Sequence, residues 1–344
     1  MPQLNKMLSG NNPAGKAPTS EKHTKLRSEG INRARKQQRR TAIIITSVVI
    51  ILVLITVGVS LYINSAPFRR IIITVDDNSI NMDYFLKRAR LSGADPTAML
   101  EQLTNELVIK IEAPQPPYNI EVSPEDIDQE LRRIASGASE TISESEFKAW
   151  YRQVLNETKL SDTEYRENVA ISLLAARLHE YLAARVPTVA EQVHLHATPL
   201  STEDIEKMWE KEDEGEDLAK FASEIWQDKQ SEGEVEDLGW LPRGVLFSGF
   251  DQVAFSLTIG EVSEPVVYSG EDSTSEEIYY YLLMVSEKAA ARQIDEEPLQ
   301  ILQGKALDDW LSEEIKRHKV GWHGLKNGFD SETYAWIHWQ LTKK

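Results

Sequence analysis

The fold of the second half of the chain is decided by two stretches of sequence, VHLHATPL at residues 193–200 and DLGWLPRG at residues 237–244. The first alternates apolar and polar side chains, which is typical of a strand with one buried face. The elements predicted around these stretches are helices at residues 203–209 and 218–226, a polar loop, a short helix at 250–257, and strands at 265–268 and 278–285. Because strands and short helices alternate over about 100 residues, this part is predicted to be a compact α+β unit.

Helical spacing dominates the sequence before this unit, over residues 82–186. Asp95 followed by Pro96 predicts the start of a helix, because aspartate accepts hydrogen bonds from free N–H groups and proline suits the first helical position. Ser161 with Glu164 has the pattern of a capping box ahead of another helix. These stretches are predicted to be amphipathic helices with one buried face.

Helical spacing returns after the α+β unit. The residues that recur there at helical intervals are Leu299, Leu302, Ala306, Trp310 and Ile315. Such an apolar stripe needs a surface to cover it, so residues 288–344 are expected to complete a helical domain that residues 64–187 begin. The predicted fold class is therefore α+β, with a helical domain interrupted by an insert at residues 188–287.

Residues 42–63 form a stretch of 22 residues without a charge, AIIITSVVIILVLITVGVSLYI. A helix of that length rises about 33 Å, which matches the hydrocarbon core of a bilayer, about 30 Å thick. A buried core helix is rarely so long and so uniformly apolar, and the long region before this stretch does not suit a cleaved signal peptide. We therefore expect an uncleaved signal anchor, an N-terminal transmembrane helix.

Charge is distributed unevenly on the two sides of this stretch. The whole chain has 38 basic and 55 acidic residues and a net charge of −17, which argues against nucleic acid as a partner. Residues 1–41 nevertheless hold ten basic and two acidic residues and few large apolar side chains, so they are expected to form a disordered tail. The positive-inside rule places this tail in the cytoplasm and the acidic bulk of the chain outside the cell membrane.

Five segments of the α+β unit follow one another in the order, and nearly the spacing, of a known family. They are residues 193–197, 227–231, 237–244, 250–257 and 260–266. Together they resemble the parvulin domain of peptidyl-prolyl cis-trans isomerases. The flanking helices resemble the chaperone domain of SurA-like and PrsA-like foldases, which surrounds a parvulin insert in this arrangement.

The resemblance implies a set of site residues. The family's first histidine corresponds to His196, and its acidic or thiol residue, in a loop, corresponds to Asp228. Its apolar wall, which binds the substrate proline, corresponds to Leu246 and Phe250. Its second histidine corresponds to Tyr281, where a phenol replaces the family's imidazole in the catalytic set. Because of this departure from the family we expect weak but measurable isomerase activity.

Metal chemistry is not expected from the sequence. His194 and His196 lie two residues apart on a predicted strand and would share a face, as a pair of metal ligands can. No third ligand is signalled nearby, and the chain has no cysteine, which excludes disulfides and thiolate sites. We therefore expect neither a metal nor a cofactor.

The anchor and the resemblance together imply a single-pass protein of the cell membrane with a large extracytoplasmic part. Its expected function is that of a foldase, in which the helical domain binds unfolded, newly translocated proteins and the parvulin domain isomerises their X-Pro bonds. Uncatalysed isomerisation takes tens to hundreds of seconds, slow enough to limit folding. The alternative is a non-catalytic chaperone that uses a degenerate parvulin domain to bind peptides; an envelope scaffold without client binding is a third possibility.

Overall fold

A computed structural model gives the structure of the chain and describes residues 46–60, 62, 65–137, 141–215, 217–268 and 279–343. The predicted basic tail, residues 1–41, lies outside the described residues, as do residues 42–45, 61 and 63 of the predicted anchor. The chain divides into two compact units, residues 1–69 and residues 70–344.

In the first unit, residues 46–60 are helical, and the large apolar side chains between Val48 and Val59 are 49–65% exposed. A short 3-10 turn, η1 (Pro67–Arg69), ends the unit. Among the residues that the structure describes, no helix is both long enough and apolar enough to cross a membrane.

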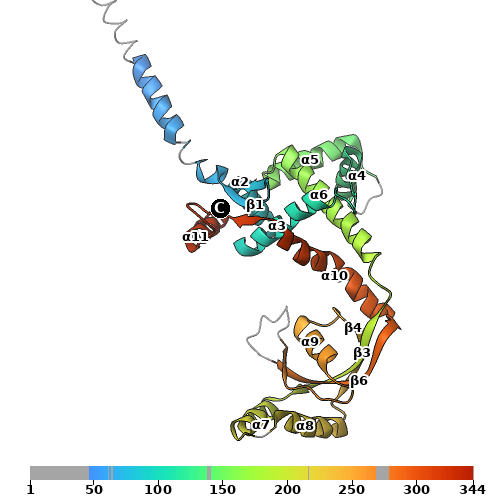
Figure 1. The fold of residues 1–344 in the computed structure, drawn as a ribbon. Helices are drawn as coiled ribbons and strands as arrows, with labels where there is room; N and C mark the ends of the chain where they lie inside the picture. Colours follow the sequence, from blue (N-terminus) through green and yellow to red (C-terminus); the bar gives the residue numbers. More distant parts are fainter. Residues whose placement is uncertain are drawn as a thin grey trace, which may run out of the picture. The chain divides into compact units, whose positions relative to one another are not determined.

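In the second unit, a helical part is made from two separate stretches of chain (Figure 1). The first stretch holds β1 (Ile71–Val75), β2 (Asn78–Asn81), α2 (Met82–Ser92), α3 (Pro96–Glu112), α4 (Pro124–Ser136), α5 (Glu144–Thr158) and α6 (Asp162–Ala183). The second holds α10 (Glu296–Glu314), η2 (Ile315–Arg317), β7 (Val320–Trp322) and α11 (Ser331–Thr342). Strand β7 pairs with β1 in an antiparallel sheet of order β2-β1-β7, so the end of the chain completes a sheet that residue 71 begins.

The helices begin at the caps that the sequence predicts. The Asp95 carboxylate accepts a hydrogen bond from the N–H of Thr97, with Pro96 at the first helical position. Ser161 and Glu164 form the predicted reciprocal capping box at the start of α6. Each cap satisfies N–H groups that have no partner within the helix, so it fixes where the helix starts.

Helix α10 packs along α6 and α3. The Nε2 atom of His179 on α6 lies 2.9 Å from the backbone carbonyl oxygen of Gln303. The indole N–H of Trp310 donates to the hydroxyl of Tyr118 at 2.6 Å, and the two rings meet edge to face. The residues of the predicted apolar stripe are half-buried, whereas Leu311, one position beyond Trp310, is buried.

The α+β unit lies between these two stretches in sequence. Its elements are β3 (Val189–Leu200), α7 (Thr202–Asp213), α8 (Leu218–Glu232), β4 (Glu236–Pro242), α9 (Ser248–Ser256), β5 (Val266–Tyr268) and β6 (Tyr279–Gln293). The strands form an antiparallel sheet of order β4-β3-β6-β5. The described chain is thus a mixed α+β protein, as the sequence predicts.

Helices cover both faces of this sheet. On one face, Leu195, Ala197 and Leu283 pack with Phe250 of α9. On the other, Leu282 packs with Met208 of α7 and with Trp226 of α8. Because neighbouring residues of a strand point to opposite faces, each side chain of β3 and β6 belongs either to the α9 face or to the α7–α8 face.

Candidate active site and histidine cluster

Four aromatic rings meet on the α9 face of the sheet, and we call them the aromatic cluster: Phe247, Phe250, Tyr268 and Tyr281. The ring of Phe250 lies 4.3 Å from that of Phe247 and 5.4 Å from that of Tyr281, between centroids. Phe250 is buried, while Tyr268 is 41% exposed. The cluster therefore has an anchored base and an accessible rim, which suits the binding of a small apolar ring.

The backbone before α9 positions this cluster. Gly244 has a φ of 87°, a left-handed conformation that glycine adopts without strain. Its N–H donates to Oδ2 of Asp251 at 2.8 Å, and Nζ of Lys305 donates to its carbonyl oxygen at the same distance. Burial raises the pKa of Asp251, against the lowering effect of the hydrogen bond from Gly244. Leu246, which follows this turn, packs half-buried against the same core as Phe250.

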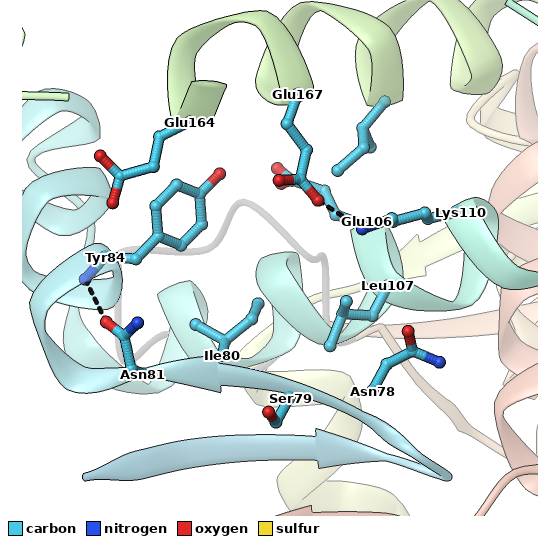
Figure 2. A pocket seen from close by; sticks show the side chains of 11 residues that line it. Asn78, Ser79, Ile80, Asn81, Tyr84, Glu106, Leu107, Lys110, Glu164 and Glu167 are labelled. Atoms are coloured by element: carbon cyan, nitrogen blue, oxygen red, sulfur yellow. Dashed lines mark hydrogen bonds and ion pairs between the residues drawn. The ribbon is translucent and has the colours of Figure 1, made fainter. Parts of the chain in front are cut away.

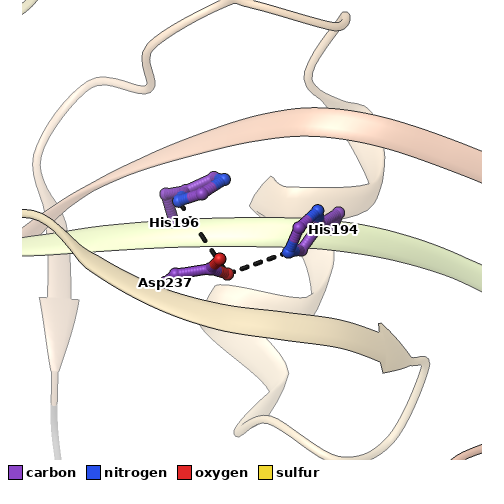
Figure 3. Close-up of side chains that lie close together, drawn as sticks. All are labelled: His194, His196 and Asp237. Atoms are coloured by element: carbon purple, nitrogen blue, oxygen red, sulfur yellow. Dashed lines mark hydrogen bonds and ion pairs between the residues drawn. The ribbon is translucent and has the colours of Figure 1, made fainter.

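His196 and Tyr281, which the resemblance pairs, lie on different faces of the sheet. His196 stands between Leu195 and Ala197, which both belong to the α9 face, so its imidazole points the other way. Its Nε2 atom lies 3.0 Å from the hydroxyl of Ser286. Figure 3 shows helix α9 behind the sheet and the imidazole of His196 in front of it. Tyr281, in contrast, belongs to the aromatic cluster.

Asp228 is exposed on helix α8, whereas the sequence places it in a loop. The helix is longer than its apolar spacing predicts and ends at Gly233, whose φ of 80° closes the last turn. The N–H of Glu234 donates to the carbonyl oxygen of Lys229 in the same turn. Of the five predicted site residues, the structure therefore brings together Leu246, Phe250 and Tyr281, and it places His196 and Asp228 elsewhere.

A second group of side chains, which we call the histidine cluster, gathers His194, His196 and Asp237 on the α7–α8 face (Figure 3). The Nε2 atom of His194 lies 2.9 Å from Oδ1 of Asp237, and the Nδ1 atom of His196 lies 3.9 Å from the same oxygen. The N–H of Gly239 holds the pKa of Asp237 below its ordinary value, despite slight desolvation, and the two histidines add to this effect. Asp237 was not predicted from the sequence to be a neighbour of the histidines, although it lies within the DLGW segment at residues 237–240.

The pocket shown in Figure 2 lies in the helical part, between β2, α2, α3 and α6. Its acidic side chains are already paired with cations: Glu167 with Lys110, Glu106 with Arg88, and Glu164 with Lys87. The bidentate contact of Arg88 with Glu106, at 2.8 and 2.7 Å, is largely buried and ties α2 to α3. These ion pairs therefore hold neighbouring helices together, and we assign no catalytic role to the carboxylates that form them.

Comparisons with known proteins agree with the fold of the α+β unit. Residues 195–277 match the PPIC-type PPIASE domain family, Rotamase. The foldase protein PrsA of Geobacillus kaustophilus is 31% identical over 108 residues, which cover 31% of this chain and 32% of that protein. PrsA of Halalkalibacterium halodurans is 24% identical over 212 residues, which cover 57% of this chain and 60% of that protein. The chain thus spans less than two thirds of the length of these curated relatives.

Solved structures of similar proteins align with larger shares of the chain but only loosely. PrsA of Bacillus anthracis aligns with 71% of this chain and 95% of its own, at 16% identity and a TM-score of 0.30. A SurA-like chaperone of Campylobacter jejuni aligns with 73% of this chain and 98% of its own, at 14% identity and a TM-score of 0.25. Residues 195–277 therefore match a parvulin domain of the PPIC type, and parts of the chain are similar in sequence to curated PrsA foldases.

Proposed function

We propose that the chain is a foldase whose parvulin domain isomerises X-Pro bonds of unfolded proteins. The observation that carries this proposal is the aromatic cluster on α9, β5 and β6, which offers a buried base in Phe250 and an accessible rim in Tyr268. An apolar surface of this kind can hold a proline ring while the peptide chain on either side stays in water.

The physical problem in this reaction is the barrier of roughly 18 to 20 kcal/mol to rotation about the amide bond, which loses its resonance at the twisted transition state. A catalyst needs an apolar surface that fixes the proline ring and a polar group that favours the twisted amide over the planar one. Phe250 and Tyr268 supply the apolar surface in this proposal. The hydroxyl of Tyr281, which can donate and accept, supplies the polar group.

His196 and Asp228 take no direct part in this mechanism as we propose it. The imidazole of His196 faces Ser286 on the opposite side of the sheet from Phe250. Asp228 is exposed on α8, which packs on that same opposite side. Their catalytic roles, implied by the resemblance, would require side chains on the α9 face, so the proposed site rests on the aromatic cluster.

The proposal extends to the remaining parts of the chain. Residues 64–187 and 288–344 form the client-binding helical domain around the insert at residues 188–287; the pairing of β7 with β1 and the packing of α10 on α6 support this. The uncharged stretch at residues 42–63 anchors the chain in the cell membrane, with the acidic part outside. The exposed apolar side chains between Val48 and Val59 support the anchor.

A specific observation favours the second candidate, a chaperone without isomerase activity. Tyr281 replaces the family's second histidine, and His196 faces away from it. Refolding of a client whose slow phase is limited by proline isomerisation separates the two functions. The foldase proposal expects the purified full-length chain in detergent both to accelerate that phase and to suppress aggregation. Suppression of aggregation with an unchanged slow phase would leave only the chaperone.

A further inference from the structure

The register of β3 against β4 brings the histidine cluster together. His194 and His196 are two residues apart on β3, so both side chains point to the same face. Leu195 pairs with Gly239 and His196 with Asp237, so β4 has one extra residue at this point, a β-bulge. Gly239 takes the left-handed conformation, with a φ of 73°, that a bulge of this kind requires. Without the extra residue, His196 would lie opposite Leu238, so the bulge is what supplies a carboxylate.

The distances within the cluster suit a common metal ion. One ligand atom from each of the three side chains lies within 4.8 Å of the others. Bonds of about 2.0 to 2.2 Å to a tetrahedral zinc ion place neighbouring ligand atoms about 3.3 Å apart. The separations of 2.9 Å and 3.9 Å from Oδ1 of Asp237 to the two imidazoles lie on either side of that value. Small side-chain rotations would therefore bring all three ligands to bonding distance.

The second nitrogen of His196 has a hydrogen-bond partner, as the rings of metal-binding histidines usually do, whereas that of His194 lies beyond hydrogen-bond distance from the nearest carboxylate. His196 places Nε2 at 3.0 Å from the hydroxyl of Ser286, which leaves Nδ1 to face Asp237. His194 directs Nε2 to Asp237 and has Nδ1 at 3.9 Å from the carboxylate of Glu287. The ring of Trp240 stacks on His194, with an interplanar angle of 14°, and restricts its rotation.

The cluster is also accessible to an ion from solvent. The side chains of His194 and His196 are 22% and 21% exposed, and that of Asp237 is 57% exposed. Three protein ligands leave one position of a tetrahedral ion for water. Two imidazoles with one carboxylate, and no thiolate, suit a divalent first-row transition metal rather than Ca²⁺ or Mg²⁺, which prefer oxygen ligands.

We propose that His194, His196 and Asp237 bind one divalent transition-metal ion of the zinc type, which joins the edge strand β4 to β3. The site lies on the opposite face of the sheet from the aromatic cluster and goes beyond the proposed foldase function. Its role is structural: it clips the edge strand at the bulge, where the ladder of backbone hydrogen bonds is interrupted.

The test is a calorimetric titration of the chelator-treated full-length chain, in detergent and without a histidine tag, with ZnCl₂. We expect one ion per chain. Asp237→Asn and His194→Gln should each weaken binding by more than the roughly 10- to 100-fold that loss of an outer partner costs. Ser286→Ala should show that smaller loss, and His338→Gln, which changes an exposed histidine of α11, should bind as the wild type does.

A second readout reports the ligands themselves and does not depend on activity. Co²⁺ should give the visible absorption of a low-symmetry tetrahedral site in the wild type, and this absorption should be lost in Asp237→Asn. Circular dichroism checks that each variant is folded. If the wild type takes up no stoichiometric Zn²⁺, or if a folded Asp237→Asn variant binds as tightly as the wild type, the cluster is only a set of hydrogen bonds and the proposal is overturned.

Discussion

At the scale of single residues, the aromatic rings of the proposed isomerase site differ in what they do: some belong to the hydrophobic core, and others lie at the rim where the proline would bind. Phe250 is 6% exposed and belongs to the core, so its truncation would remove both the site and about 3 to 5 kcal/mol of stability. Tyr268 is 41% exposed and lies at the rim. A substitution at Tyr268 therefore tests the binding of proline with little effect on the fold.

For Tyr268→Ala we expect the kcat/KM for isomerisation of a proline peptide to fall by about 2- to 12-fold, because one aromatic contact contributes about 0.5 to 1.5 kcal/mol. The matched control is Trp209→Ala, which removes an aromatic ring 49% exposed on α7, on the other face of the sheet. Equal activity of Tyr268→Ala and the wild type would show that the rim does not contact the substrate.

Tyr281→Phe isolates the polar half of the site, because it removes only a hydroxyl. A single hydrogen bond contributes about 0.5 to 1.5 kcal/mol, so kcat should fall about 2- to 12-fold while the melting temperature stays nearly unchanged. Phe250→Ala should be more damaging, since it removes the apolar surface that holds the proline ring and also opens the core. A Tyr281→Phe variant with full kcat would exclude the hydroxyl as the group that favours the twisted amide.

The sequence could predict which residues form the site better than it could predict the face of the sheet to which each side chain points. Leu246, Phe250 and Tyr281 follow from the order of the motifs, and the structure brings them to one face. The side chain of His196 points to the α7–α8 face because its two neighbours on the strand, Leu195 and Ala197, point to the α9 face. Asp237 lies beside the histidines because of a β-bulge. A bulge is a property of two paired strands, so the spacing of residues along one strand does not reveal it.

At the scale of elements, caps decide where helices start, and several of these caps are charged. Asp126 closes the capping box of α4 and contacts Arg177 of α6. The hydrogen bond from Arg177, followed by those from Ser123, holds the pKa of Asp126 well below its ordinary value. At the start of α5, the hydroxyl and the N–H of Ser143 lower the pKa of Glu146.

These two carboxylates predict a loss of stability in acid. Because their pKa values are lower in the folded chain than in the unfolded one, their stabilisation is complete above the unfolded values near pH 4 and is lost as the pH falls toward the folded ones. The melting temperature of the helical part should therefore decline between pH 5 and pH 3. Asp126→Asn should reduce this decline, whereas Asp308→Asn, at an exposed residue of α10, should not. A decline of the same size in both variants would contradict the role of the caps.

The starts of elements could be predicted from the sequence more reliably than their ends. Asp95, Ser161 and Glu164 mark helix starts with side-chain chemistry that is local. Helix α8 ends at Gly233, several residues after the last residue of its apolar stripe. Polar residues such as Asp228 extend the exposed side of the helix, so they do not add to the apolar stripe from which the helix was predicted. The loop predicted around Asp228 was wrong for this reason.

At the scale of the whole molecule, the end of the chain stabilises its helical part through β7, α10 and α11. Strand β7 pairs with β1, and Ile337 of α11 is fully buried. Trp310 donates a hydrogen bond to Tyr118. Removal of residues 296–344 would therefore expose an edge of the small sheet and part of the helical core.

We expect that deletion to reduce the protection of amide hydrogens in β1 and α3 by at least tenfold, while protection in β3 and β6 is retained, because the α+β unit has its own core. Hydrogen–deuterium exchange read by mass spectrometry measures both in one experiment, and the intact chain is the reference. Unchanged protection in β1 and α3 would mean that the two helical stretches do not form one domain.

The central claim is that the aromatic cluster catalyses prolyl isomerisation, and exchange NMR on a short X-Pro peptide tests it most directly. The exchange cross-peaks between the cis and trans forms report the interconversion rate without any coupled enzyme. We predict that the full-length chain in detergent, at substoichiometric concentration, makes these cross-peaks appear and that Tyr268→Ala weakens them. If the peptide exchanges no faster with the folded wild-type chain than without it, the domain is not an isomerase and the claim is contradicted.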